Sequence, residues 1–278
     1  MSELFGLCSN SAVKTSFAFD HANGKSRVDE ASWGVGFYRD GEMDHPYAAI
    51  IKEPISARYS LFNYFLKYGY IKTNLFISNI RYASVGTKVY LNTHPFELMV
   101  DPRPEAYAEK SWVFTHNGTM PEIRTDPVFF TAIKPHGNTD SEHIFCYFVE
   151  QLRKAYMLNG YSLGLEEKVE IIESTAKRIS SDYPNNLNFI MSDGARMYAY
   201  YSGYEIAGGL WYNAGVLLKQ KFAMTDASDG MTVKVDCEEF AEKICMVSSS
   251  PLAPTFNGGW KPFPLHELKV FEKGVMMK

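Results

Sequence analysis

Short runs of apolar residues, rich in β-branched and aromatic side chains, recur along the whole chain, and Gly, Asn, Asp or Pro residues bound them. Runs of this length and composition between turn residues are typical of β-strands. The pattern predicts ten strands: Glu3–Leu7, Trp33–Tyr38, Tyr47–Ile51, Leu75–Arg81, Trp112–His116, Leu187–Ser192, Met197–Tyr201, Glu205–Trp211, Lys243–Ser248 and Leu268–Glu272.

Longer segments carry apolar residues at steps of three and four, the spacing that places them on one face of an α-helix. These segments are Ser56–Lys67, Thr139–Leu158 and Leu165–Ser181. In the second one, Thr139 and Glu142 form a candidate capping box at the start. The apolar face of the first one is expected to consist of Leu61, Phe62, Phe65 and Leu66. We expect all three to be amphipathic helices that lie on sheets.

The order of strands and helices is mixed rather than a regular βαβ alternation, and it favours an α+β fold with antiparallel sheets. A chain of 278 residues can hold two average domains, although single domains of about 250 residues are common. The sequence has no internal repeat and no stretch with the composition of a linker. We therefore expect one domain over residues 1–278.

Composition and charge narrow the class of protein. Hydrophobic residues make up 46% and charged residues 22%, which is ordinary for a soluble globular protein. The net charge of −4 argues against nucleic acid as the main partner. No apolar run is long enough to span a membrane, and the amino terminus does not resemble a signal peptide. The few scattered cysteines indicate free thiols in the cytoplasm: Cys8, Cys146, Cys237 and Cys245.

The sequence contains no motif for a nucleotide, flavin or metal cofactor, and its histidines show no metal-ligand spacing. We therefore expect neither a cofactor nor a metal. The candidates for chemistry are instead clusters of polar residues at strand ends and at the start of the strongest helix. These clusters are Asn79–Gly86, Asn92–Phe96, Thr115–Thr119 and Gly137–Glu142.

Each candidate also has a purely structural interpretation. Arg81 can form a surface ion pair, and Asn117 followed by glycine is a common hairpin turn. Asp140 can cap its helix, and His94 and His116 can be structural histidines. For each residue alone, the structural interpretation is the more common one. The order of the clusters along the chain favours a functional interpretation instead.

In that order, the chain resembles the class II glutamine amidotransferases of the N-terminal-nucleophile hydrolase superfamily, and most of all their small stand-alone group. The family pattern is a nucleophilic Cys after the initiator Met, then Arg–aromatic–Ala–Ser/Thr–x–Gly, Asn-x-His-Pro, His-Asn-Gly and Thr-Asp-Ser-Glu. The matching segments here are Arg81–Gly86, Asn92–Pro95, His116–Gly118 and Thr139–Glu142. The segments Trp33–Tyr38, Asn188–Gly194 and Ser249–Leu252 are similar to the stand-alone group as well. The resemblance implies a four-layer αββα sandwich.

The resemblance also implies how an amide would be attacked. The side chain of residue 2, here Ser2, would be the nucleophile, and its own α-amino group, with a pKa of about 7.7–8.0, would take the proton. Asn117 would donate its side-chain amide to the tetrahedral oxyanion, and Gly118 would donate its backbone N–H. Gly118 would also leave room for the substrate, because it has no Cβ.

The remaining motif residues would bind the substrate, glutamine or a γ-glutamyl amide. Arg81 would hold the α-carboxylate as a two-pronged donor, and Asp140 would pair with the α-ammonium. Asp140 can do so only if Thr139 is the cap of the helix. Further members of this pocket would be Ser84, Gly86, His94 and His116, the two histidines supporting loops by hydrogen bonds.

Residue 2 is the main departure, because the family has Cys where this chain has Ser2. A hydroxyl is far harder to ionise than a thiol of pKa about 8.5, so a site shaped for sulfur is expected to lose most of its activity. Three explanations stay open: an engineered inactivating substitution, a natural serine enzyme, and a natural relative that has lost activity. The α-amino base also requires that Met1 be removed. Cys8 has no free amine and is expected to be a buried structural thiol.

The leading hypothesis is a cytoplasmic glutaminase-type hydrolase that converts a γ-carboxamide to glutamate and ammonia, with activity impaired by Ser2. Transfer of the ammonia would require a separate synthetase as partner. One alternative is an amidohydrolase that acts on γ-glutamyl conjugates. Another is a catalytically silent regulatory subunit that binds glutamine. The sequence is compatible with an oligomer and predicts no membrane association.

Overall fold

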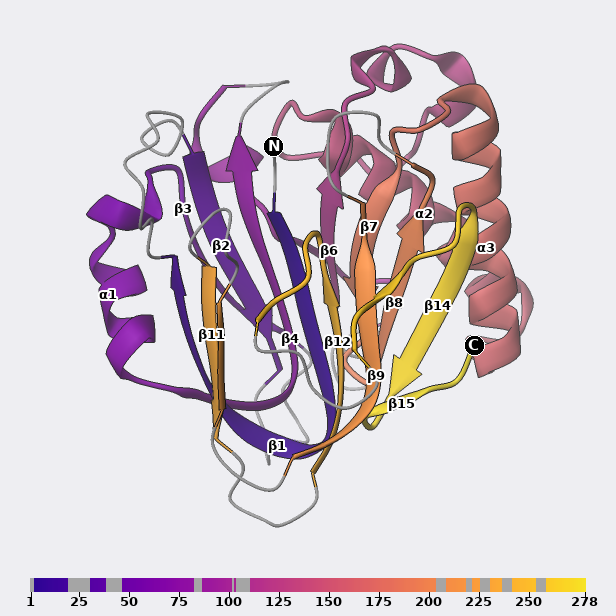
Figure 1. Ribbon diagram of the computed structural model, residues 1–278. Helices are drawn as coiled ribbons and strands as arrows, with labels where there is room; N and C mark the ends of the chain where they lie inside the picture. The colour runs from indigo at the N-terminus through magenta and orange to yellow at the C-terminus, as the bar shows by residue number, and fades with distance from the viewer. Residues whose placement is uncertain are drawn as a thin grey trace.

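The computed structural model describes residues 3–19, 31–38, 47–82, 87–101, 103, 111–203, 209–218, 222–225, 231–236, 242–253 and 259–278. Two antiparallel sheets stack on each other (Figure 1). Helix α1 (Leu61–Tyr68) lies on the outer side of the first sheet, and helices α2 (Asp140–Leu158) and α3 (Leu165–Asp182) lie on the outer side of the second. The arrangement confirms the predicted α+β fold, a four-layer αββα sandwich.

The first sheet has the order β13-β9-β12-β1-β4-β2-β3, and β11 also pairs with β1 and with β10. Its pairings are antiparallel. Its strands are β1 (Glu3–Phe19), β2 (Ala31–Phe37), β3 (Ala49–Glu53), β4 (Ile71–Tyr82), β9 (Trp211–Leu218), β10 (Phe222–Thr225), β11 (Met231–Asp236), β12 (Glu242–Ser248) and β13 (Lys261–Pro262). β1 is central, so the start of the described chain lies inside the sheet.

The second sheet has the order β15-β14-β8-β7-β6-β5. Its strands are β5 (Phe96–Leu98), β6 (Trp112–Asn117), β7 (Asn188–Ser192), β8 (Arg196–Tyr201), β14 (Glu267–Glu272) and β15 (Val275–Met276). Single-turn 3₁₀ helices occupy the connections at Ala57–Tyr59, Tyr90–Asn92, Pro121–Arg124 and Pro127–Phe129. The strands β5 and β6 lie at the edge of this sheet, next to the loop that contains the Asn92–Pro95 motif.

Apolar side chains fill three layers. Between the sheets lie side chains such as Leu4, Ile77, Val113 and Ile190. Between the second sheet and its helices lies an aromatic core that includes Phe114, Phe145, Phe148 and Phe189. The outer face of the first sheet carries Phe5, Trp33 and Phe76, and Leu66 of α1 belongs to the same core. Each strand therefore presents alternate residues to two different cores, as expected for the two-residue period of a β-strand.

The predicted strands overlap observed strands, with one exception and one large extension. Residues 204–208 of the predicted strand Glu205–Trp211 lie outside the described residues, and β9 begins only at Trp211. β1 continues to Phe19, although the polar run after Leu7 predicted its end there. A register shift between Cys8 and Val13 absorbs this polar run, and β1 then pairs with β4 and β11.

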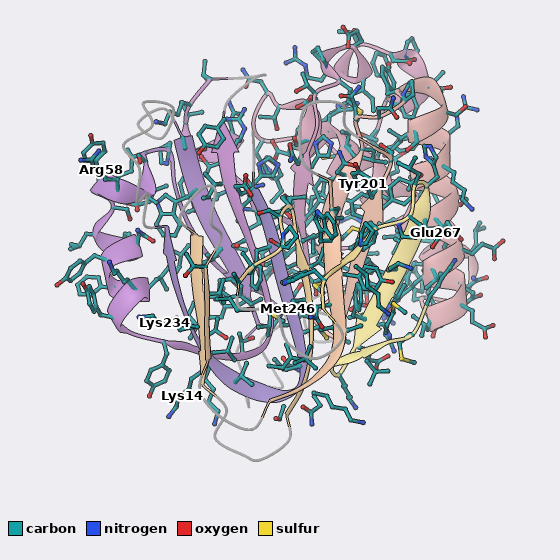
Figure 2. The ribbon with its side chains drawn as sticks, in the orientation of Figure 1. Lys14, Arg58, Tyr201, Lys234, Met246 and Glu267 are labelled. Carbon is teal, nitrogen blue, oxygen red and sulfur yellow. The ribbon has the colours of Figure 1, made fainter. Side chains whose placement is uncertain are left out.

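Helix α1 differs from its prediction. It begins at Leu61, after the 3₁₀ turn Ala57–Tyr59, and the Ser60 side chain caps it by accepting from the N–H of Asn63 at 2.9 Å. The predicted apolar face is wrong, because Leu66 is buried whereas Leu61 is 65% exposed. The other exposed members are Phe62 and Phe65. Figure 2 shows the neighbouring Arg58 at the outer edge of the molecule, beside α1.

Among the described residues, no helix combines the length and the apolar character needed to cross a membrane.

Candidate active site

The start of β1 and the end of β4 lie side by side in the first sheet, where Glu3 pairs with Ile80. Ile77 of β4 belongs to the core between the two sheets. Because side chains alternate along a strand, Asn79 and Arg81 point to the same side as Ile77, toward the second sheet. Arg81 therefore lies buried beside the beginning of the described chain.

Three residues of the predicted site lie outside the described residues, namely Ser2, Ser84 and Gly86. Their expected roles as nucleophile and as pocket lining stay predictions. The described residues on either side of them are Glu3, Tyr82 and Thr87.

Arg81 and Asp140 are buried charged groups that influence each other electrostatically. Burial lowers the pKa of the Arg81 guanidinium below its ordinary value, and the negative charge of Asp140 acts in the opposite direction. Asp140 also acts on His116, where it opposes the decrease in pKa that burial causes. The structure thus brings the two predicted substrate-binding charges into one region, although they come from β4 and from α2.

The start of α2 fixes the position of Asp140. Thr139 is the helix cap, and its Oγ1 accepts from the N–H of Glu142 at 3.1 Å. Asp140 is nevertheless not free of backbone donors, because its Oδ2 accepts from the N–H of Met120 at 2.8 Å and its Oδ1 from that of Ser141 at 2.9 Å. A carboxylate has about four lone-pair sites, so these bonds leave acceptor capacity for a ligand.

The predicted capping box is only half present. The Glu142 carboxylate does not return to the cap residue but accepts from the backbone N–H groups of His136 at 2.9 Å and Gly137 at 2.7 Å. These bonds hold the loop before α2 against the first turn of the helix. The loop is therefore fixed by the helix that carries Asp140.

The end of β6 carries His116 and Asn117, which point to opposite sides of the second sheet. Nδ1 of His116 is 2.9 Å from Oγ of Ser141, and Nε2 is 2.8 Å from the carbonyl oxygen of Asn186. A carbonyl only accepts, so Nε2 donates to it and Nδ1 accepts from the serine hydroxyl. Burial lowers the pKa of His116, which favours this neutral tautomer. Asn117 points in the other direction, toward the first sheet.

Gly118 follows Asn117 directly, and the chain continues into the turn before Pro121 instead of forming the hairpin that is common for Asn-Gly. A Cβ at Gly118 would collide with the backbone carbonyl oxygen of Asn186. The glycine is thus required by contact with the protein's own backbone. The sequence prediction had attributed it to the approach of a substrate.

The buried side chain of His94 lies near two positively charged residues and a second histidine. Burial holds the pKa of His94 well below its ordinary value, and Arg81, His116 and Lys52 act in the same direction. Its ring contacts Phe96, with 4.6 Å between the ring centroids. Among the described residues, neither ring nitrogen of His94 has a hydrogen-bond partner. The expectation that His94 supports a loop by hydrogen bonds stays a prediction.

A small cavity of about 180 Å³ lies beside the His94–Pro95 segment. Its lining comprises Ile50, Lys52, Tyr90, Leu91, Pro95, Phe96, Glu97, His136 and Glu142. Nζ of Lys52 donates to the carbonyl oxygen of Pro95 at 3.1 Å, and burial lowers the pKa of Lys52 to about 8. The alternation of β3 gives no sign of this role, so the sequence reasoning did not find Lys52.

Cys8 does not offer a second nucleophile. Its side chain is buried in the core between the sheets, directly opposite Cys245 of β12. Burial raises the pKa of Cys8 to about 11, so the thiolate is scarcely populated at neutral pH. The expectation of a structural thiol is confirmed. In the described part of the chain, no group of three or more His, Cys, Asp or Glu side chains is arranged to hold a metal ion.

Comparison with known proteins agrees with this geometry. The family described as class II glutamine amidotransferases matches residues 1–278. An uncharacterized protein from Methanocaldococcus jannaschii is 29% identical over 277 residues, covering 100% of this chain and 71% of that protein. A Haemophilus influenzae protein, provisionally named as a glutamine amidotransferase, is 27% identical over 274 residues, covering 94% of this chain and 80% of its own.

A solved structure has the same fold. The crystal structure of a predicted glutamine amidotransferase from Pseudomonas aeruginosa covers 99% of both chains, with a TM-score of 0.71 and 20% identity. At this identity, the likeness shows a shared α+β sandwich fold. Since the family matches the full length, this chain belongs to the class II glutamine amidotransferases.

Proposed function

We propose that this protein binds glutamine and hydrolyses its γ-carboxamide to glutamate and ammonia through a nucleophile at residue 2. The proposal rests above all on one observation: Arg81, Asp140 and the start of β1 converge although they come from distant parts of the sequence. An amino acid with a free carboxylate and a free ammonium matches this pair of opposite charges.

The proposed reaction gives each of these groups a role. Arg81 binds the α-carboxylate of glutamine, and Asp140 binds the α-ammonium, so the amide carbon faces residue 2. The side chain of residue 2 attacks this carbon while its α-amino group accepts the proton. Asn117 and the backbone N–H of Gly118 stabilise the oxyanion, one such donor contributing about 3–4 kcal/mol. The α-amino group then protonates the departing ammonia, and water hydrolyses the resulting acyl-enzyme.

With serine at residue 2, we expect slow hydrolysis of glutamine, because an oxygen nucleophile is more difficult to ionise than sulfur. The test compares three chains: the protein with Ser2, the variant Ser2→Cys and the variant Ser2→Ala as a control. Removal of Met1 is checked by intact mass, and release of glutamate and ammonia from glutamine is measured. We expect turnover in Ser2→Cys and none in Ser2→Ala. Absence of turnover in a correctly processed Ser2→Cys protein would contradict the proposal.

The same residue supports a second candidate function. With Ser2, the protein acts as a silent subunit that recognises glutamine without consuming it. Binding of glutamine with no turnover in either Ser2 or Ser2→Cys would favour this function. A parallel assay with γ-glutamyl dipeptides tests for an amidohydrolase of γ-glutamyl conjugates, which would release an amino acid instead of ammonia.

If the ammonia is transferred rather than released, the protein needs a partner that accepts it. We further propose that the ammonia is passed to an acceptor substrate on a synthetase in the cytoplasm. Mixing the Ser2→Cys protein with such a synthetase should increase the rate of glutamine hydrolysis only when the acceptor substrate is present.

A further inference from the structure

Two polar side chains in the candidate site are buried with no hydrogen-bond partner in the described structure. Asn79 is 1% exposed, and neither its Oδ1 nor its Nδ2 is bonded. His94 is 2% exposed, and neither ring nitrogen is bonded. Unpaired buried groups destabilise a fold, so they are normally satisfied by another group or by ordered water. The polar atoms of Asn79 and His94 are therefore available to ordered water or to a bound molecule.

Asn79 and His94 are neighbours across a glycine. Gly34 of β2 pairs with Asn79, and a Cβ at Gly34 would collide with the carbonyl oxygen of His94. Neighbouring strands lie about 4.8 Å apart. The backbone of His94 thus stands about one strand spacing from Asn79. Arg81 lies two residues further along β4 and points to the same side.

The charged residues around Asn79 and His94 favour the binding of a neutral ligand over a charged one. Burial and the positive charges of Arg81 and Lys52 keep the pKa of His94 well below its ordinary value, so its imidazole is neutral at physiological pH. A cation would be repelled by these charges, and an anion would be drawn to Arg81 rather than to the uncharged pair. A neutral imidazole and a carboxamide offer both donors and acceptors, which suits a small molecule that both donates and accepts.

We propose that Asn79 and His94 are positioning residues that bind the water molecule which hydrolyses the acyl-enzyme. The inference rests on the proposed function, since only an acyl-enzyme needs such a water. A buried water makes about three hydrogen bonds. The carboxamide and the imidazole supply two of them, and the third remains for the reaction.

The hydrolytic step balances without any further reactant. The water oxygen forms a bond to the acyl carbon, and one water proton passes to the α-amino group of residue 2. The bond between the acyl carbon and the side chain of residue 2 then breaks, and the α-amino group returns the proton to that side chain. The products are glutamate and the free nucleophile. Asn79 and His94 exchange no proton in this step and only orient the water.

The test uses the processed Ser2→Cys protein and γ-glutamyl p-nitroanilide, whose colour reports acylation. In the variant Asn79→Leu, the carboxamide is replaced by an apolar side chain of similar size, so no bond to the protein is lost. We expect a normal burst of p-nitroaniline followed by a steady-state rate about 100-fold lower, because a misplaced reactant costs about this factor. Intact mass should then reveal accumulated γ-glutamyl enzyme.

Added hydroxylamine separates positioning from general damage. It attacks the acyl-enzyme without using the water site, so it should restore turnover of Asn79→Leu as γ-glutamyl hydroxamate. Asn213→Leu is the matched control. Asn213 of β9 is also buried, and its Nδ2 has no partner in the part of the chain that the structure describes. This variant should keep both the burst and the steady-state rate.

The outcomes distinguish the inference from the proposed function. No release of p-nitroaniline by the Ser2→Cys parent would refute the proposed function and the inference together. Release by the parent with an unchanged steady-state rate in Asn79→Leu would refute the water site alone, and so would a slower first turnover in Asn79→Leu with unchanged deacylation. If Asn79→Leu fails to fold, Asn79→Ala serves the same assay. A high-resolution crystal structure without water between Asn79 and His94 would also overturn the inference.

Discussion

At the scale of single residues, Arg81 and Asp140 reach the candidate site from different layers of the molecule. The guanidinium comes from β4 in the first sheet, and the carboxylate comes from the first turn of α2 behind the second sheet. Both are buried, and buried charges persist only when they are paired or hydrogen-bonded. Asp140 has the Met120 N–H, and its charge acts on Arg81. In the proposed function, this pair binds the two opposite charges of glutamine.

The variant Asp140→Asn tests this role. The amide oxygen of the substituted side chain can still accept from the N–H of Met120, so the fold should persist while the negative charge is lost. A hydrogen bond to a charged group contributes about 1.5–3 kcal/mol, so the Kd for glutamine should rise about 10- to 100-fold. Calorimetric titration of the Ser2 protein measures this change. Glu150→Gln, further along α2, should leave the Kd unaltered, and an equal loss in both variants would contradict the assignment.

The buried histidines predict how stability depends on pH. The pKa of His94 and of His116 lies below the ordinary value because both rings are buried. The unfolded chain, with a histidine pKa of about 6.5, therefore binds more protons than the folded protein at mildly acidic pH. The free energy of unfolding should be highest above about pH 7 and fall toward about pH 5.5, by up to about 1.4 kcal/mol per pH unit for each histidine.

Urea denaturation at a series of pH values measures this slope. His94→Phe keeps an aromatic ring against Phe96 but removes one titrating group, so the slope should become shallower even if the absolute stability changes. An identical slope in the parent and in His94→Phe would show that another group causes the dependence.

Residue identities in the site could be predicted from the sequence only where a motif marks them. Arg81, Asn117 and Asp140 stand in motifs whose order matches a family. Asn79 stands beside one of these motifs, but its proposed role rests on a side chain without a hydrogen-bond partner among the described residues, which only packing reveals. In the sequence, Lys52 looks like an ordinary charged residue of an edge strand. Only the structure shows that its Nζ donates to the carbonyl oxygen of Pro95.

At the scale of elements, helix α1 buries few of its own residues. Its apolar residues lie on several sides of the helix, and only Asn63 and Leu66 of α1 are buried. Local periodicity cannot choose which of several apolar faces turns inward, so the prediction failed here. It succeeded for α2, where the apolar positions Ile144, Phe148 and Leu152 form one stripe and are all buried.

The variants Leu66→Ala and Phe65→Ala test the orientation of α1. Leu66 is buried in the core of the first sheet, so its truncation should lower the free energy of unfolding by about 2–3 kcal/mol. Phe65 is 60% exposed, and its truncation should change stability by less than about 0.5 kcal/mol. Chemical denaturation measures both. The reverse ranking would mean that the helix is rotated relative to the structure.

Strands were predictable where alternation and turn residues agree, as in β6 and β7. β1 was predicted to end at Leu7, because the segment that follows is polar. Its continuation depends on partners from distant parts of the chain, since Thr15 pairs with Ile71 on one side and Val235 on the other. Such long-range pairing overrides local preference and leaves no mark in the sequence of β1.

At the scale of the whole molecule, the candidate site lies where the contact between the two sheets changes from apolar to polar. Leu4 and Ile77 of the first sheet pack against Val113 of the second. Further along the same strands, this apolar filling gives way to Asn79, Arg81 and Asn117. A ligand held there contacts groups from both sheets, so its binding free energy also strengthens the stacking of the sheets.

This coupling predicts that glutamine raises the thermal stability of the whole sandwich. A ligand that binds only the folded state adds about 2.7 kcal/mol at 100 times its Kd. The melting temperature of Ser2→Ala, which binds without turnover, should therefore increase with glutamine concentration in differential scanning calorimetry. Asp140→Asn should reduce this increase to about half or less at the same concentrations, and glutamate should give a smaller one if the amide contributes to binding. A melting temperature of Ser2→Ala that does not depend on the glutamine concentration would mean that Arg81 and Asp140 do not bind an amino acid between the two sheets.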